Sequence, residues 1–144
     1  MRRFEFDITP VEQARPRATR LGKGIRLYDP KKVTAFKRQL GMMARQQMAD
    51  RGLDPADGPL AVKMIFYRPI QSGLSGKERA RRLSGAHRPT VKPDLSNYIK
   101  ATEDALNGLL WVDDNLIVTE MAEKHYSDHP RLIIEINEME VTDE

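Results

Sequence analysis

The chain has 144 residues, 40% hydrophobic and 31% charged, which is ordinary for one globular domain with a buried core. It contains no cysteine, which excludes disulfides, thiolate metal sites and cysteine nucleophiles. The basic N-terminus lacks the apolar core of a signal peptide, and no apolar run approaches the roughly 20 residues of a membrane span. We therefore expect a cytoplasmic protein that contacts no membrane.

Two short strands are predicted near the N-terminus, over residues 2–8, where apolar and polar residues alternate, and over 25–28. Between them, residues 12–24 are basic and interrupted by Pro and Gly, which favours a loop. The apolar segment at 60–69 predicts a further strand.

A long helix is predicted between the second and third of these strands. Asp29 is expected as its N-cap and Pro30 as its first helical residue, and Gly52 marks its end. Its apolar face is expected to include Val33, Phe36, Leu40, Met43 and Met48.

Residues 70–92 are predicted to form a flexible basic loop. The segment holds six Lys and Arg against one Glu, together with three Gly and three Ser, a composition that does not build a core. A plain solvated linker is the alternative, but its basic excess next to an acidic region favours contact with nucleic acid.

The second half predicts a helix from about Asp94 to Asn107-Gly108, a short extended run at 109–112, and strands over 116–126 and 131–137. The whole chain therefore predicts a single α+β domain with a mixed or antiparallel sheet and two main helices.

Charge is distributed unevenly along the chain. Residues 1–92 hold 21 Lys and Arg against 8 Asp and Glu, a balance of +13, and residues 93–144 hold 3 against 13, a balance of −10. A basic half favours a polyanionic partner, and an acidic half that recruits a divalent metal would suit phosphodiester chemistry. Simple segregation of solvated charges is the alternative, and composition does not decide between the two.

The second helix is amphipathic. At about 100° per residue, one arc is apolar and is expected to pack on the sheet. The arc holds Leu95, Tyr98, Ile99, Thr102, Ala105, Leu106 and Leu109. On the polar side, Asn97, Lys100 and Asp104 follow i, i+3, i+7 spacing and are expected to form one ridge.

Three acidic residues flank this helix, and each has two interpretations. Asp94 is either an N-cap, which contributes about 1 kcal/mol, or a metal ligand at the start of the helix. Asp113 and Asp114 suit a turn, but adjacent carboxylates repel each other and a divalent cation relieves that repulsion. Lys100 is either a solvated lysine or a group that stabilises charge at a metal-bound phosphodiester.

These residues resemble the RusA-like family of Holliday junction resolvases, common in phages and prophages. The family motif is approximately K-P-D-x-D-N-x-x-K, then D-A-L-x-G, then D-D before a strand. The matching residues here are Lys92-Pro93-Asp94-Leu95-Ser96-Asn97, Lys100, Asp104-Ala105-Leu106-Asn107-Gly108 and Asp113-Asp114.

The resemblance implies a homodimeric, Mg²⁺-dependent endonuclease, with Mn²⁺ as a possible substitute, that cuts four-way DNA junctions by paired, symmetric nicks in a bacterial or phage-infected cell. It implies that Asp94 and Asp114 are catalytic metal-site residues, with Asp113 adjacent, and that Lys100 is required for cleavage. Ser96, Asn97 and Asp104 are expected to support the site. The residues expected to contact DNA are Arg15, Arg17, Arg79, Arg81, Arg82, Arg88 and Lys92.

Ser96 departs from the family, which usually has a second catalytic aspartate at this position. A hydroxyl is a weaker ligand than a carboxylate, so a junction-binding protein with weak or no cleavage is the alternative function. A structural phage protein without a nucleic-acid role is a third, which the basic excess of residues 1–92 disfavours. We expect a working site with weaker metal binding, because Mg²⁺ often uses one or two protein carboxylates and keeps waters.

Overall fold

A four-stranded sheet in the order β1-β6-β4-β5 forms the centre of the computed structural model, which describes residues 1–140. The strands are β1 (Arg2–Phe6), β4 (Leu60–Pro69), β5 (Ile117–Ser127) and β6 (Arg131–Glu138). Strand β6 runs antiparallel to β1 and β4, whereas β4 and β5 are parallel. The sheet is mixed, which confirms the predicted α+β class.

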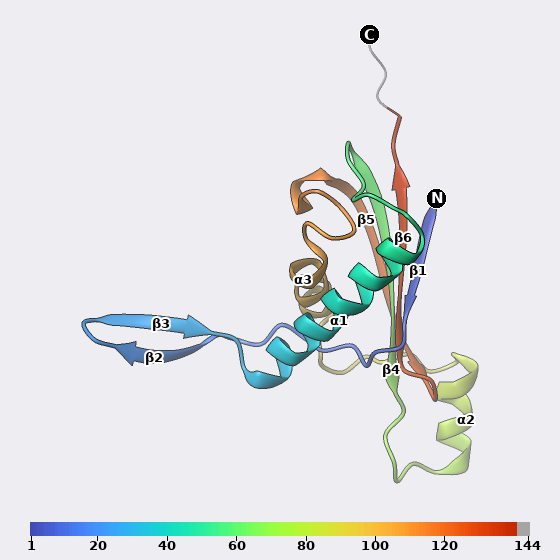
Figure 1. The fold of residues 1–144 in the computed structure, drawn as a ribbon. Helices are drawn as coiled ribbons and strands as arrows, with labels where there is room; N and C mark the ends of the chain where they lie inside the picture. The colour runs from blue at the N-terminus through green and yellow to red at the C-terminus, as the bar shows by residue number, and fades with distance from the viewer. Residues whose placement is uncertain (141–144) are drawn as a thin grey trace.

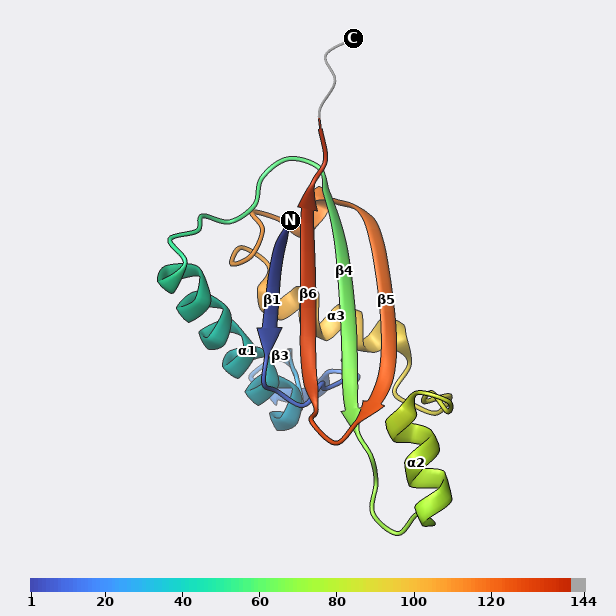
Figure 2. The same cartoon turned by 90° about the vertical axis from the view of Figure 1, so that its right-hand side faces the viewer.

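Helices α1 (Lys31–Asp50) and α3 (Leu95–Leu106) cover one face of this sheet, and the other face is open (Figure 2). Side chains alternate across a strand, and alternate residues of β4 and β6 are buried beneath the helices: Leu60, Val62, Met64 and Phe66 on β4, and Leu132, Ile134 and Ile136 on β6. The largest fully buried side chains come from both layers and include Phe4, Phe6, Leu40, Phe66, Leu106, Trp111 and Ile134. The amphipathic face predicted for α3 is confirmed, with Tyr98, Thr102 and Leu106 buried.

The parallel pairing of β4 with β5 requires a long connection between the two strands, and this connection contains α3. Parallel neighbours need a crossover connection that returns the chain to the start of the first strand. Helix α3 belongs to that crossover: its first residue follows the segment that leaves the end of β4, and its last residue precedes the turn into β5. Helix α3 lies across the covered face of the sheet, with its start near β5 and its end near α1 (Figure 2).

The structure corrects the prediction that residues 70–92 form a loop, because the segment contains helix α2 (Gly76–Ser84). The Ser75 hydroxyl accepts a hydrogen bond from the Glu78 amide at 3.2 Å, and Gly85 ends the helix in the left-handed region at φ 83°. No residue of α2 is buried. The Arg82 guanidinium lies 4.4 Å from the ring centre of Tyr126 on β5 and ties the helix to the sheet edge.

A second correction concerns residues 12–24, which were expected to form only a loop. Residues Arg17–Leu21 form strand β2, which pairs with β3 (Gly24–Tyr28), the strand that was predicted. This hairpin projects away from the body of the domain (Figure 1), and every residue in both strands is exposed.

Two smaller expectations are also corrected. Helix α1 begins at Lys31 with Pro30 at the N-cap position, and Asp29 provides no side-chain cap. Residues 109–112 form turns with isolated bridges at Trp111 and no strand. Within residues 1–140, no helix combines the length and apolar character needed to cross a membrane.

The free energy of unfolding should depend strongly on how α1 packs against the rest of the core. Leu40 is fully buried on this helix, whereas Met42 is 62% exposed two residues later. We expect Leu40→Ala to lower the free energy of unfolding by about 2–5 kcal/mol, since it removes buried methyl groups and leaves a cavity. Met42→Ala, the matched control, should change it by less than about 0.5 kcal/mol. Urea denaturation followed by circular dichroism measures both, and equal effects would contradict this assignment of the core.

Candidate active site

Asp94 occupies the N-cap position of α3 but does not cap the helix with its side chain. Its backbone is extended, at φ −63° and ψ 142°, and its carboxylate makes no cap hydrogen bond. The residue is exposed. The first interpretation of Asp94, a side-chain cap, is therefore not realised, and the carboxylate faces solvent where a ligand can reach it.

Asp113 and Asp114 lie at the other end of α3, around the short 3-10 helix η1 (Asp114–Leu116). One Asp113 oxygen accepts a hydrogen bond from the Asn115 amide at 3.0 Å. The Asp114 amide donates to Asn107 Oδ1 at 3.0 Å, and its carboxylate accepts from the indole nitrogen of Trp111 at 2.6 Å. Because Trp111 is fully buried, this bond fixes the Asp114 side chain against the core.

Glu103 on α3 and Glu120 on β5 join these aspartates, and neither was predicted from the sequence. Burial, followed by a hydrogen bond with Glu120 and the charges of nearby carboxylates, raises the pKa of Glu103 to about 8. Burial also raises the pKa of Asp114, assisted by the charges of Asp104, Asp113 and Glu120, although the Trp111 bond opposes the shift. The acidic end of α3, as we call Glu103, Asp104, Asp113, Asp114 and Glu120, thus concentrates negative charge around partly buried carboxyl groups.

Asp94 and Asp114 lie apart within one chain. Asp94 precedes the first residue of α3, and Asp114 is bonded to Asn107, which follows the last. A helix of 12 residues is about 18 Å long, whereas two ligands of one ion lie only a few ångströms apart. Within residues 1–140, no three acidic or histidine side chains converge as a metal site.

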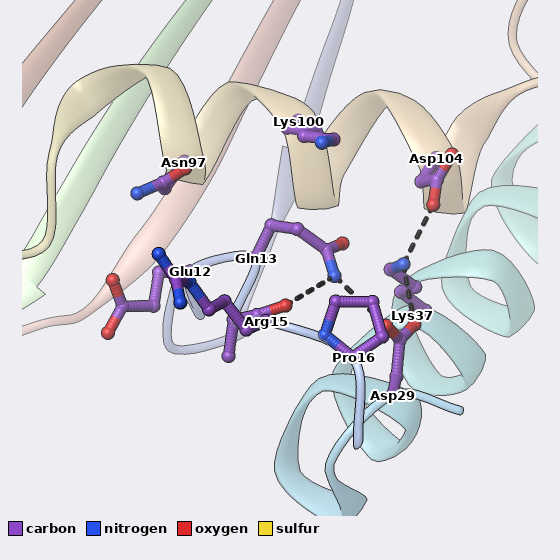
Figure 3. Close-up of a pocket in the computed structure, with 10 residues that line it drawn as sticks. Glu12, Gln13, Arg15, Pro16, Asp29, Lys37, Asn97, Lys100 and Asp104 are labelled. Carbon is purple, nitrogen blue, oxygen red and sulfur yellow. Dashed lines mark hydrogen bonds and ion pairs between the residues drawn. The ribbon is translucent and has the colours of Figure 1, made fainter. Parts of the chain in front are cut away.

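A cleft of about 620 Å³ runs between α3, the loop before the hairpin, and α1. Asn97, Lys100 and Asp104 line one wall of this cleft, which agrees with the prediction that they share one side of the helix. Arg15 lies opposite them (Figure 3). Lys37 closes one end with bonds of 2.8 Å to both Asp29 and Asp104. Burial tends to lower the pKa of Lys37, but these two carboxylates outweigh it and raise the pKa, so the amine stays charged.

The sequence model of the family described as endodeoxyribonuclease RusA matches residues 7–137, which is nearly the whole chain. This chain belongs to the RusA endodeoxyribonuclease family. It is also 34% identical over 132 residues to the uncharacterized protein YqaN of Bacillus subtilis (strain 168), with 90% of this chain and 91% of that protein covered.

The basic residues that the RusA resemblance marks for DNA contact lie on three separate segments. Arg15 borders the cleft, Arg17 opens the projecting hairpin, and the others belong to α2 and the segment after it. Some are already engaged within the chain: Arg82 bonds Glu78 at 3.0 Å, and Arg88 Nε donates to the Lys124 carbonyl at 3.4 Å. Arg79, Arg81 and Lys92 are exposed.

The raised pKa of Glu103 predicts how stability depends on pH. In the folded state the Glu103 carboxyl stays protonated up to about pH 8, whereas in the unfolded chain it ionises near pH 4.5. The free energy of unfolding should therefore fall as pH rises between those values. We expect Glu103→Gln to match the wild type near pH 4.5 and to exceed it at pH 8. With a discount for partial exposure, the gain should be about 1 kcal/mol.

Urea denaturation in EDTA at several pH values measures this difference. Glu140→Gln, which alters an exposed glutamate far along the chain, serves as the control and should show no such trend. Parallel pH profiles for the wild type and Glu103→Gln would show that Glu103 titrates normally in the folded protein.

Proposed function

We propose that this protein is a divalent-metal-dependent endonuclease that resolves four-way DNA junctions by paired, symmetric nicks. The observation that carries the proposal is the match to the RusA endodeoxyribonuclease family over residues 7–137, with the motif residues placed around α3. As a DNA enzyme, the protein would act in the cytoplasm of a bacterial or phage-infected cell, as a homodimer that presents one site to each nicked strand.

In this proposal, the basic segments hold DNA through its phosphates. Such contacts position the duplex arms without reading sequence, and they weaken as salt rises. Arg79 and Arg81 on α2 and Arg17 on the hairpin lie on elements that extend beyond the central sheet, and their exposure supports this role (Figure 1). Lys100, in the wall of the cleft, is placed to donate to a phosphate oxygen and to stabilise negative charge.

The acidic residues support the use of Mg²⁺, with Mn²⁺ as a substitute, because hard oxygen ligands suit these ions. Asp113 and Asp114 are the proposed ligands at the acidic end, and Asp94 is the proposed ligand at the start of α3. One chain alone does not fit a shared ion, since the length of α3 separates these two groups. When bound, the ion would supply activation of water and neutralisation of the scissile phosphate.

Ser96 supports a second candidate function, a junction-binding protein with weak or no cleavage. The residue is exposed in the first turn of α3, two positions after Asp94, and offers a hydroxyl where the family usually has a carboxylate. Fewer carboxylates would weaken metal binding but would also repel DNA phosphates less. Comparing labelled four-way junction and linear duplex, each with Mg²⁺, Mn²⁺ or EDTA, separates the two functions.

Replacement of the proposed metal ligands should separate cleavage from binding. We expect Asp94→Asn and Asp114→Asn each to abolish cleavage of a labelled junction in Mg²⁺, because each removes a carboxylate charge. Junction affinity should persist, since phosphate contacts come mostly from Lys and Arg. Gel-shift and cleavage assays measure both, with Asp54→Asn, an exposed aspartate in the α1–β4 loop, as the active control. Full cleavage by either variant would remove that residue from the proposed site.

Ser96→Asp should lower the Mg²⁺ concentration needed for half-maximal cleavage. At about 4 Å and an effective dielectric near 20, a unit charge pair interacts by roughly 4 kcal/mol; a divalent ion doubles this, although desolvation offsets much of the gain. The same variant should bind junctions more weakly in EDTA. A Mg²⁺ titration tests this, with Ser72→Asp as a control that adds the same charge elsewhere. A variant that needs as much Mg²⁺ as the wild type would place Ser96 outside the metal's ligand shell.

A further inference from the structure

The β2–β3 hairpin carries apolar side chains that the described residues leave uncovered. Residues paired across two strands share a face, so Ala18, Ile25 and Leu27 lie on one face, with Arg20 beside Ile25. We call Ala18, Ile25 and Leu27 the apolar face. Ile25 is 74% and Leu27 66% exposed. Apolar residues at alternate positions of a strand commonly pack on a core, but this hairpin stands clear of the core (Figure 1).

The opposite face of the hairpin is basic. It includes Arg17 and Arg26, with Tyr28 at its base and Leu21 at its tip. Residues 15–28 hold five Lys and Arg and no Asp or Glu. A partner with both negative charge and apolar surface would complement the two faces. Nucleic acid has this chemistry, because its phosphates are anionic and the flat faces of its bases are apolar.

The base of the hairpin is fixed at the rim of the cleft. Pro16 and Asp29, the residues just before and just after it, line the cleft together with Lys100 (Figure 3). Asp29 accepts hydrogen bonds from Lys37 of α1 at 2.8 Å and from the Gln13 side chain at 2.9 Å. The Gln13 backbone amide also donates to a carbonyl of α3 at 2.9 Å. These bonds hold the hairpin in one direction relative to Lys100, so DNA in the cleft also meets the hairpin.

The shape of the hairpin suits a projecting element. Its strands join through Gly22 and Lys23, with Gly22 at φ 60°, and two-residue turns of this kind match the twist of paired strands. At about 3.3 Å per residue, its five-residue strands extend about 17 Å. A DNA major groove is roughly 8.5 Å deep, so the hairpin can pass the phosphate backbone and reach the bases. A two-stranded hairpin alone is only marginally stable in water, and burial of the apolar face by a partner would stabilise it.

A four-way junction offers base faces that a linear duplex does not. Inside a duplex, each base pair stacks on both neighbours, and a side chain inserted there has to break that stacking. At a branch point, the pair that ends an arm loses one stacking neighbour when the arms separate, so less stacking has to be broken. Aliphatic side chains act as wedges between base steps in other DNA-binding proteins. The apolar face therefore fits the branch point better than the interior of an arm.

We propose that the hairpin inserts at the branch point of four-way DNA, with its apolar face against the base pair that ends an arm and its basic face toward phosphates. The inference rests on the proposed function, which supplies the branched DNA. It adds to that function a way to select junctions that is independent of the carboxylates around α3. The hairpin recognises the branch, and the cleft beside it holds a strand near Lys100.

Binding measured in EDTA tests the wedge without cleavage. Ile25→Thr combined with Leu27→Thr, the double variant, replaces aliphatic side chains by polar ones that still favour a strand. The Kd for a labelled four-way junction should rise about tenfold, since each aliphatic side chain that leaves water contributes severalfold to affinity. The Kd for linear duplex should change by less than about twofold, because the phosphate contacts remain.

Two further variants control this measurement. Met42→Thr with Met139→Thr alters two exposed apolar residues elsewhere and should bind junctions as the wild type does. Ile25→Leu with Leu27→Ile keeps the apolar area of the hairpin and should also bind as the wild type does. A double variant that binds junctions as tightly as the wild type, or that loses junction and duplex affinity equally, would overturn the proposal.

A fluorescent base analogue tests where the hairpin makes contact. 2-Aminopurine fluoresces more strongly when it is unstacked, so next to the branch point it should brighten when the wild type binds. Saturating amounts of the double variant should cause little change, and 2-aminopurine in the middle of an arm should respond to neither protein. An equal response at both positions would place the hairpin in a groove and overturn the proposal.

The outcomes separate failure of the wedge from failure of the proposed function. A wild type that cuts junctions, with an unchanged Kd for the double variant, would retain the nuclease and overturn the wedge. Junction binding that depends on the apolar face, without cleavage in Mg²⁺, would overturn the nuclease and retain the wedge. Sedimentation tests the other occupant of the apolar face: a lower mass for the double variant than for the wild type would assign this face to contact between copies and overturn the proposal.

Discussion

The parallel pairing of β4 and β5 is the constraint on which the rest of the site depends. Because β5 must start beside the start of β4, the chain has to return along the sheet after β4, and α3 is part of that connection, crossing behind the strands from the β5 edge toward α1 (Figure 2). The motif residues before and after α3 are close in sequence, yet the crossover holds them a helix length apart. The same constraint leaves β5 at the edge of the sheet, unpaired on one side.

The electrostatics of the two ends of α3 differ for physical reasons. The C-terminal end of a helix carries a partial negative charge, so the acidic end brings carboxylates to a place where the helix dipole disfavours them. Partial burial further disfavours the charged form, so the pKa of Glu103 is raised and its carboxyl stays protonated near neutral pH. A cation or a basic surface would relieve this repulsion between carboxylates. Within the described residues, Lys37 supplies one such positive charge, next to Asp104. At the start of α3 the dipole favours an anion, and the Asp94 carboxylate there makes no cap hydrogen bond to the helix.

Much of the fold was predictable because long amphipathic elements dominate it. The periodicity of α3, the length of α1 and the apolar runs of β4, β5 and β6 all gave correct elements. Helix α2 was missed because its composition outweighed its capping signals, although Ser75, Glu78 and Gly85 provide a start and a stop. Strand β2 was missed because its residues are mostly basic or polar and follow Pro16, whereas Ile25, Leu27 and Tyr28 gave its partner β3 an apolar signal.

The site was harder to predict than the fold, for reasons visible in particular residues. Asp94, Asp113 and Asp114 are recognisable by motif, and their roles remain predictions. Glu103 and Glu120 carry no motif signal, since their proximity arises from the packing of α3 on β5. The separation of Asp94 from Asp114, by contrast, was available from the sequence, because a predicted helix of known length lies between them.

The separation of Asp94 from Asp114 determines what Lys100 can contact. It stands six residues after Asp94 and seven before Asn107, so about 9–11 Å of helix lies on either side of it. That spacing excludes it from direct contact with both carboxylate groups at once, but a long, flexible ammonium side chain can reach across the cleft that it lines. Asp104 forms its close ion pair with Lys37 rather than with Lys100. Among the ridge residues, Lys100 is therefore the one whose charge is available to a phosphate that lies along α3, between the acidic groups at its two ends.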